Sequence, residues 1–267
     1  MAVADRKNRI LDNLAKFRIF DDILLSNVFD RQIPETQLLI RTITGDDDIT
    51  VVSSEGEYSI SNPYNHEARL DIVAFDSKGK VYHFEVQKDK DGATPRRARL
   101  TAGLLDSTLL EKGKDYSELP DRYTIFITEE DYFQKGLPVY RAENTIRELE
   151  NRPLGDGGYI WYVNGAYRDE STAIGRLMHD FACENPDDII TPLLRDRVCY
   201  LKKKEEGKET MCELVQNLMN EQSRDDRIEC AIDAIAEGKY SLEEIAKLFR
   251  LPLSTVQELA AAQKKSV

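Results

Sequence analysis

Apolar and polar residues alternate most regularly between residues 69 and 87. Two alternating runs are joined there by the polar segment 76–80, which is typical of the turn of a β-hairpin. Because successive side chains of a strand point to opposite faces, Asp71 lies on the same face as apolar residues of the first run. Glu85 and Gln87 share one face of the second run. The pattern therefore predicts a hairpin whose apolar strands are each interrupted by an acidic residue.

The patterns on either side of this hairpin predict both helices and strands. Apolar residues spaced three and four apart predict helices, and short runs of β-branched and aromatic residues predict strands. In chain order, the elements expected around the hairpin are helices within 7–29 and at 36–43, one strand or a strand pair over 49–52 and 58–60, a helix at 95–110, and strands at 123–128 and 159–164. Residues 129–142 contain Gly136 and Pro138, and we expect a loop there.

Almost every pattern after residue 171 is helical. The expected helices lie near residues 172–183, 187–206, 208–221, 224–237, 241–249 and 254–262. The order of elements predicts an α/β domain over residues 1–170, followed by an all-helical C-terminal region over residues 171–267.

The end of the helical region, residues 241–256, resembles a helix-turn-helix. A short helix, a turn and a second helix capped by Ser254 match that shape. The second helix offers few side chains that read bases, namely Gln257 and the terminal lysines. A packing or oligomerisation module, with a second copy of the chain as partner, is therefore favoured over sequence-specific DNA binding.

Composition narrows the class of protein. Hydrophobic residues make up 41% of the 267 positions and charged residues 32%, with no apolar run long enough to span a membrane. There is no apolar core of a secretory signal, and the four cysteines lack C-x-x-C spacing, so we expect a cytoplasmic protein with reduced thiols and no membrane partner. The histidines have no zinc-ligand spacing with these cysteines. A net charge of −12 argues against a broad nucleic-acid-binding surface, although a local basic face remains compatible with it.

Asp71 and Glu85 interrupt apolar strands at positions where a carboxylate has to lose water. Burying an unpaired carboxylate is costly, so such residues usually have a charged partner or a metal ion. Two carboxylates that meet on one face repel each other unless a divalent cation lies between them, and oxygen ligands suit Mg²⁺ or, alternatively, Mn²⁺. The alternative is a structural ion network in which both acids pair with nearby basic residues, namely Arg69, Lys88 and Arg97.

Basic residues crowd the start of the helix that follows the hairpin. Arg96, Arg97 and Arg99 oppose the helix dipole there, and a phosphate or carboxylate opposite them would offset that cost. The alternative is three solvated arginines. Asp22 has two readings as well: it belongs to an Asp-Asp pair that caps a helix, or it also points at the carboxylates near Asp71.

Taken together, these segments resemble a known family of nucleases. The similarity is carried by residues 21–22, 28–29, 68–72, 82–87, 97–99, 104–106, 111–116 and 123–128, within the range 18–205. Asp71 followed by Glu85-Val86-Gln87 resembles the motif of the PD-(D/E)xK phosphodiesterase superfamily. The surrounding segments are similar to the recombination-promoting nuclease (Rpn)/transposase-like family within it.

The resemblance implies a restriction-endonuclease-like αβββαβ core with a mixed central sheet and a Mg²⁺-dependent DNA endonuclease activity. It places metal ligands at Asp71 and Glu85, with the helix acid at Asp22. Gln87 occupies the position that is usually lysine. The removal of that positive charge, and the absence of aromatic residues in segment 99–102, are departures from the family pattern.

We expect DNA as the partner and carry two functions forward. In the first, the site is an active nuclease in which the carbonyl of Val86 completes the metal shell and Gln87 positions the attacking water. Substrate phosphates would then be met by Lys88 and the helix arginines, Arg96, Arg97 and Arg99. In the second, the fold is retained as a non-catalytic DNA-binding or protein-interaction module.

Overall fold

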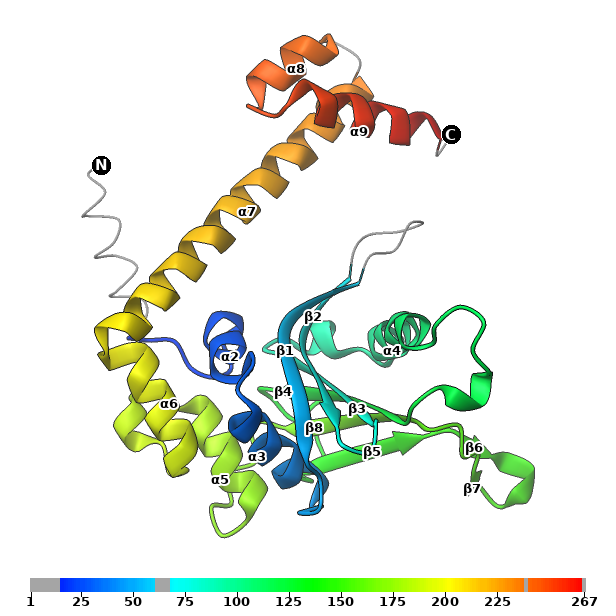
Figure 1. The fold of residues 1–267 in the computed structure, drawn as a ribbon, viewed down its shortest axis with the longest axis vertical. Coiled ribbons are helices and arrows are strands. Elements are labelled where there is room, and N and C mark those ends of the chain that lie inside the picture. Colours follow the sequence, from blue (N-terminus) through cyan, green and yellow to red (C-terminus); the bar gives the residue numbers. More distant parts are fainter. Residues whose placement is uncertain (1–14, 61–67, 238–239, 266–267) are drawn as a thin grey trace. The chain divides into compact units, whose positions relative to one another are not determined.

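The structure, a computed structural model, describes residues 15–60, 68–237 and 240–265 (Figure 1). Contacts divide the chain into two compact units, Met1–Met211 and Cys212–Val267. Among the described residues, no helix combines the length and the apolar character needed to cross a membrane.

A six-stranded mixed sheet forms the centre of the first unit. Its strands, in spatial order, are β1 (Val51–Ile60), β2 (Ala68–Asp76), β3 (Val81–Gln87), β4 (Arg122–Thr128), β8 (Gly158–Asn164) and β5 (Val139–Glu143). The pairs β1–β2 and β2–β3 are antiparallel, the pairs β3–β4 and β4–β8 are parallel, and β5 is antiparallel to β8. The predicted α/β class and the mixed central sheet are confirmed.

Strand β5 is the element of the sheet that the sequence patterns missed. Residues 139–143 lie within the segment that was expected to be a loop, and that expectation was wrong for them. Only Val139 of this strand is buried, and the last three residues are exposed. Strand β5 lies at the edge of the sheet, where most of its side chains are exposed, so its sequence shows no apolar alternation. A short hairpin, β6 (Thr145–Ile146) with β7 (Arg152–Pro153), follows it.

Helices lie on both sides of the sheet. Figure 1 shows α2 (Asp22–Phe29) and α3 (Ile33–Thr44) on one side and α4 (Pro95–Leu109) on the other. Residues 7–14 of the first predicted helix lie outside the described residues. The prediction was wrong for residues 15–20, which are not helical, whereas α2 begins at Asp22, within the Asp-Asp pair that was expected to open a helix.

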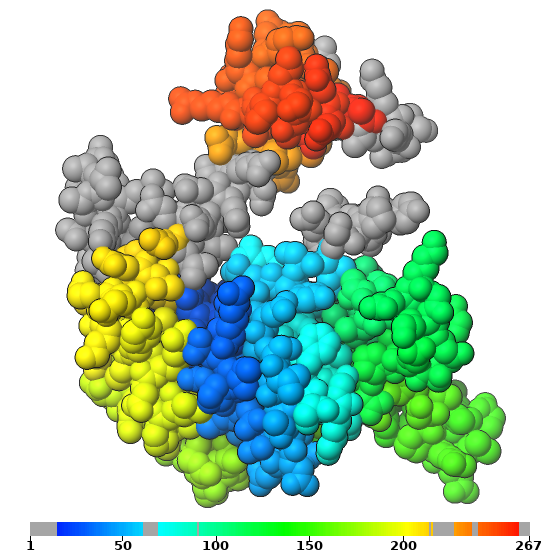
Figure 2. All heavy atoms as spheres, in the orientation of Figure 1, coloured from blue at the N-terminus to red at the C-terminus, as the bar shows by residue number. Residues whose placement is uncertain are grey.

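Two further helices belong to the first unit. Helices α5 (Ala173–Ala182) and α6 (Pro192–Lys203) pack against α3, and α6 also packs against α2. In the space-filling view the yellow-green residues of these helices lie beside the blue N-terminal helices (Figure 2). The compact unit thus includes helices that follow residue 170, where the sequence analysis placed its domain boundary.

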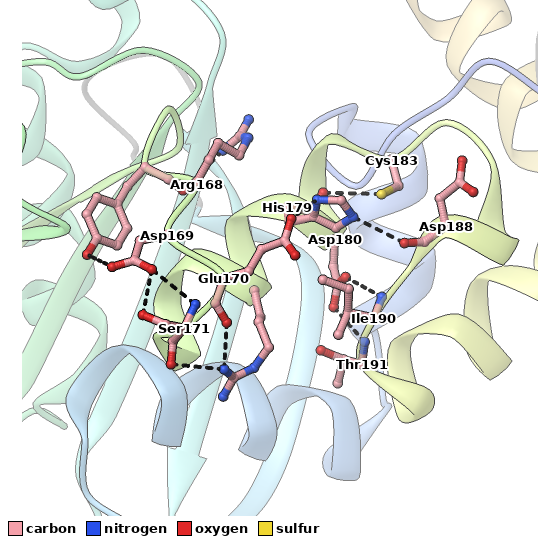
Figure 3. A network of polar contacts seen from close by, with 12 residues as sticks. Arg168, Asp169, Glu170, Ser171, His179, Asp180, Cys183, Asp188, Ile190 and Thr191 are labelled. Atoms are coloured by element: carbon pink, nitrogen blue, oxygen red, sulfur yellow. Dashed lines mark hydrogen bonds and ion pairs between the residues drawn. The ribbon is translucent and has the colours of Figure 1, made fainter.

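A polar network holds the connection from α5 to α6 (Figure 3). Asp180 is fully buried, and its two carboxylate oxygens accept hydrogen bonds from the backbone N–H groups of Ile190, at 2.7 Å, and Thr191, at 3.0 Å. His179 lies 3.1 Å from the carbonyl oxygen of Asp188 through Nε2. Asp180 therefore has a structural explanation, because its charge is matched by two backbone donors.

Replacing Asp180 with alanine is expected to lower the free energy of unfolding by about 2 kcal/mol, because the backbone N–H groups of Ile190 and Thr191 lose their acceptor. Asp180→Asn keeps one acceptor oxygen, so a smaller loss is expected. Denaturant unfolding of the two variants measures both values. Wild-type stability of Asp180→Ala would contradict this role.

The second unit is helical. Helix α7 (Glu205–Glu237) runs through the segments 208–221 and 224–237 as one helix, so the predicted break between them was wrong. No proline or glycine lies between these segments to interrupt it. The end of α7 packs with α8 (Leu242–Leu248) and α9 (Leu253–Lys265) around a small apolar core of Ala231, Ile245, Ala246, Leu251 and Val256. Helix α9 begins before Ser254, so Ser254 lies inside the helix rather than at its cap.

Candidate functional site

Strands β2 and β3 separate where the two predicted carboxylates lie. Their pairing ends at Ile72 opposite Phe84, although β2 continues back to Ala68 and β3 forward to Gln87. One step beyond the last pair, the register sets Asp71 against Glu85. The backbone N–H of Val86 has no ladder partner on β2 and donates instead to Asp71 Oδ2, at 2.9 Å.

Both carboxylates lie on the sheet face that α4 covers. Val73, two residues from Asp71, packs in one apolar cluster with Leu105 of α4. Glu85 is 1% exposed and forms an ion pair with Arg97 of the same helix, with Arg97 Nη2 3.2 Å from Glu85 Oε2. The structure therefore brings the two acids together from neighbouring strands, which the hairpin pattern left to the register.

Neighbouring charges influence the ionisation of Asp71 and Asp22. Burial, followed by the charge of Glu85, raises the pKa of Asp71 to about 8, and Asp22 adds to the rise. The Val86 N–H and Arg97 act in the opposite direction. The pKa of Asp22 is raised by burial and by neighbouring acids that include Glu85, while Lys88 opposes the rise. Three acidic side chains therefore share one electrostatic environment, and adding negative charge to it is unfavourable.

The Asp-Asp pair before α2 does not form the expected side-chain cap. Asp21 occupies the N-cap position without a capping hydrogen bond, so the capping reading of the pair was wrong. Its carboxylate instead accepts from the Arg18 backbone N–H and pairs with Lys88. Asp22 is the first residue of α2, and its interaction with Glu85 supports the reading in which it points toward the carboxylates.

Glu85 has three side-chain partners. His83 Nε2 lies 3.0 Å from Oε1, while Arg97 Nη2 and Gln87 Nε2 lie 3.2 Å and 3.4 Å from Oε2. His83 was not among the predicted site residues. Strand alternation already placed it on the face of Glu85, and a histidine inside an apolar strand is the signal that could have identified it.

Gln87 is held against the turn that follows β3. Gly92 lies in the short 3₁₀ helix η1 (Lys90–Ala93), and a Cβ atom on it would lie 1.9 Å from Gln87 Oε1. Only glycine leaves space for the glutamine amide at this point. Gly92 is, after His83, a second residue that shapes the site and that the sequence did not reveal. Nothing in a polar loop indicates which side chain will pack on a glycine.

The predicted basic residues divide into two groups. Arg97 contacts Glu85, and Lys88 lies beside the acids through its pair with Asp21. Arg96 and Arg99 instead line a groove of about 590 Å³, with neither Asp71 nor Glu85 among its lining residues. Acidic side chains also line this groove: Asp106, Glu143 and Asp156. The structure thus places two of the four basic residues near the carboxylates.

A structural ion network would pair the two carboxylates with Arg69, among other basic residues. Arg69 forms an ion pair with Glu57 of β1. Of the three basic residues named for that network, Arg97 is the one with a direct ion pair to Asp71 or Glu85 within the described chain.

The oxygen atoms around Asp71 and Glu85 form a partial set of ligands for a divalent cation. Within the described residues, no group of three or more His, Cys, Asp or Glu side chains has the geometry of a metal site. Two carboxylates do converge, and the Val86 carbonyl points to the same side of β3 as its N–H, toward Asp71. Two carboxylates plus a carbonyl, with water completing the shell, suit Mg²⁺, which retains several waters in proteins.

Comparisons of the chain with protein-family models, with curated proteins and with solved structures found no match.

Proposed function

We propose that this protein is a metal-dependent DNA endonuclease of the PD-(D/E)xK type, similar to the Rpn/transposase-like family. The observation that carries the proposal is the gap between β2 and β3, where Asp71 and Glu85 meet beyond the last paired residues of the two strands. Repulsion between buried carboxylates costs folding free energy, and a bound cation would remove that cost.

The order of elements supports a restriction-endonuclease-like core. Helix α2 or α3, strands β1 to β3, helix α4 and strand β4 follow the αβββαβ sequence expected of that core. In this assignment the catalytic residues lie where β2 separates from β3, on the face of the sheet that α4 covers.

In the proposed mechanism Asp71 and Glu85 hold the cation, with the Val86 carbonyl as a third oxygen ligand. When bound, Mg²⁺ or Mn²⁺ would polarise the phosphodiester and make a water molecule acidic enough to attack it near neutral pH. Gln87 can donate or accept a hydrogen bond and so orient that water, but it supplies no charge.

Arg97 supplies the positive charge that Gln87 lacks. Its side chain is 46% exposed, while its guanidinium contacts the buried Glu85. Arg97 is therefore accessible to a substrate in solution and also lies next to the two carboxylates. A guanidinium in that position can bind a phosphate oxygen and stabilise the charge that develops in the transition state. Lys88 is the second cation at this edge, and Asp21 holds it there.

Plasmid cleavage tests the proposal. Wild-type protein with Mg²⁺ or Mn²⁺ should nick or cut DNA, and EDTA should stop the reaction. Asp71→Ala and Glu85→Ala should be inactive. Asp187→Ala, which removes an exposed carboxylate paired with Lys203, is the matched control and should retain wild-type activity. Undiminished cleavage by Asp71→Ala would contradict the proposal.

Replacing Gly92 with alanine is expected to lower the cleavage rate about tenfold, since the new methyl group displaces the Gln87 amide. The backbone at Gly92 has an ordinary φ, and the displaced group is the end of a flexible side chain, so the fold should be retained. Gly103→Ala is the control, because its added methyl group meets nothing within 4 Å. Equal rates for the two variants would show that the location of Gln87 is irrelevant.

A second candidate function is a non-catalytic DNA-binding or protein-interaction module. The observation in its favour is that both oxygens of Glu85 already have partners within the chain. Calorimetry distinguishes the two functions, since a folded protein with no affinity for Mg²⁺ or Mn²⁺ would support the module.

A further inference from the structure

His83 is a buried polar residue with a single partner. Its side chain is fully inaccessible to solvent, and its Nε2 atom lies 3.0 Å from Glu85 Oε1. Its other ring nitrogen, Nδ1, is buried without a hydrogen-bond partner. An unsatisfied buried polar atom costs free energy, and an apolar side chain at this position would avoid that cost.

The contact to Glu85 fixes which ring nitrogen carries the proton. A carboxylate oxygen accepts hydrogen bonds, so Nε2 is the donor and Nδ1 the unprotonated atom in the neutral ring. The imidazole thus acts as a rigid donor directed at one oxygen of one acid. His83 is fully buried, with Val73 of β2 and Thr124 of β4 as its strand neighbours, so the ring cannot turn away without disturbing the core.

This contact divides the two oxygens of Glu85 between two tasks. Oε1 is engaged inside the sheet by His83, while Oε2 is the oxygen directed at Arg97 and Gln87. A cation at the gap between β2 and β3 would have to take Oε2 from Arg97, whose side chain is 46% exposed, and from Gln87 at 3.4 Å, whereas the buried His83 keeps Oε1.

Building on the proposed function, we infer that His83 is a positioning residue that restricts Glu85 to single-oxygen coordination and thereby sets the preference of the site among divalent cations. Mg²⁺ needs near-octahedral geometry and few protein ligands, whereas Ca²⁺ accepts more ligands and commonly binds both oxygens of a carboxylate. Holding Oε1 away from the ion favours Mg²⁺ and Mn²⁺ over Ca²⁺. Hydrogen bonds to metal-binding carboxylates commonly change metal affinity by about 10–100-fold.

The test is calorimetric titration of Mn²⁺ and Ca²⁺ into wild type, His83→Phe and His83→Gln, with circular dichroism as a check of folding. The wild type should prefer Mn²⁺. His83→Phe removes the donor and should reduce that preference about tenfold or more, through weaker Mn²⁺ binding, tighter Ca²⁺ binding or both. His83→Gln restores an N–H donor and should recover most of the preference.

Tyr82→Phe is the matched control. Tyr82 is a buried neighbour on the opposite face of β3, and its hydroxyl bonds to Asp76 outside the site. It should leave the ratio of the two affinities unchanged. An unchanged ratio in folded His83→Phe would overturn the inference while leaving the proposed nuclease intact. Absence of any ion binding by the wild type would overturn both.

If His83→Phe does not fold, nitrogen NMR of the wild-type imidazole provides the second measurement. The inference predicts a proton on Nε2 and a shift of its resonance when Mg²⁺ saturates the protein. A proton on Nδ1 instead, or no response to bound Mg²⁺, would overturn the inference.

Discussion

Asp71→Asn is expected to abolish metal-dependent cleavage, by about a thousandfold or more, while making the metal-free protein more stable. Loss of a charged ligand removes the cation that activates the water, and single electrostatic contributors at active sites are commonly worth 10²–10³-fold. Asparagine keeps the shape of the side chain and the acceptor for the Val86 N–H. It removes the charge that burial and Glu85 disfavour.

The gain in stability should depend on pH in a defined direction. Burial raises the native pKa of Asp71 to about 8, above its ordinary value near 3.8, so the native state binds more protons than the unfolded state between these values. The contribution of Asp71 to stability is therefore full below about pH 4 and is lost as the pH rises through about 8. Asparagine at this position has no such dependence.

We accordingly expect Asp71→Asn and wild type to have similar stability at pH 4 and to differ by about 2–4 kcal/mol at pH 8 in EDTA, with the variant more stable. A pKa difference of about four corresponds to a ceiling of about 6 kcal/mol, which partial exposure of Asp71 reduces. Denaturant unfolding of both proteins across this range is the measurement. A variant that is less stable than wild type at pH 8 would contradict the strained-carboxylate account.

Glu85→Ala is expected to have the opposite effect on stability, although it too should abolish cleavage. Glu85 is almost fully buried and accepts from three side chains, so its removal leaves His83 with no partner and opens a cavity. Breaking one side of a buried charge pair costs about 3–5 kcal/mol, and the half-exposed Arg97 reduces this to about 2–4 kcal/mol.

Chemical unfolding of Glu85→Ala measures this loss, with Asp187→Ala as the matched control. Asp187 forms an exposed ion pair with Lys203, which is expected to contribute less than about 1 kcal/mol. Equal stability changes in Asp71→Asn and Glu85→Ala would mean that both acids serve only as structural charges. Stability changes of opposite sign support a division in which Glu85 is stabilised by its partners within the protein and the charge of Asp71 is disfavoured by burial and by Glu85.

The central hairpin could be predicted from sequence because its information is local. Alternation indicated the faces of Asp71 and Glu85, and the polar segment indicated the turn between the strands. The structure supplies the register, with Ile72 opposite Phe84, and the separation of β2 from β3 beyond that pair. Such a separation depends on how β2 also pairs with β1, and no pattern within the hairpin specifies it.

Elements without a local apolar pattern were predicted less well. Strand β5 is mostly exposed, and the packing of its neighbour β8 determines it more than its own sequence does. Helix α7 was divided in the prediction because its polar middle resembles a break, although no glycine or proline lies between the two predicted segments.

Within the site, the sequence identified charged residues better than the residues that position them. Arg97 and Arg96 are neighbours in the chain, yet only Arg97 faces Glu85, because successive residues of a helix point in different directions. His83 acts through its contact with Glu85, and Gly92 through its contact with Gln87. Neither contact is visible in the sequence before β3 is buried and η1 is packed against it.

Calorimetric titration of Mn²⁺ into wild type and Asp71→Asn tests the central claim most directly. The claim is that Asp71 and Glu85 form one site for a divalent cation at the gap between β2 and β3. It predicts one bound ion per wild-type chain, and no measurable binding by a fully folded Asp71→Asn variant. Equal Mn²⁺ affinity in the two proteins, or none in a folded wild type, would contradict it.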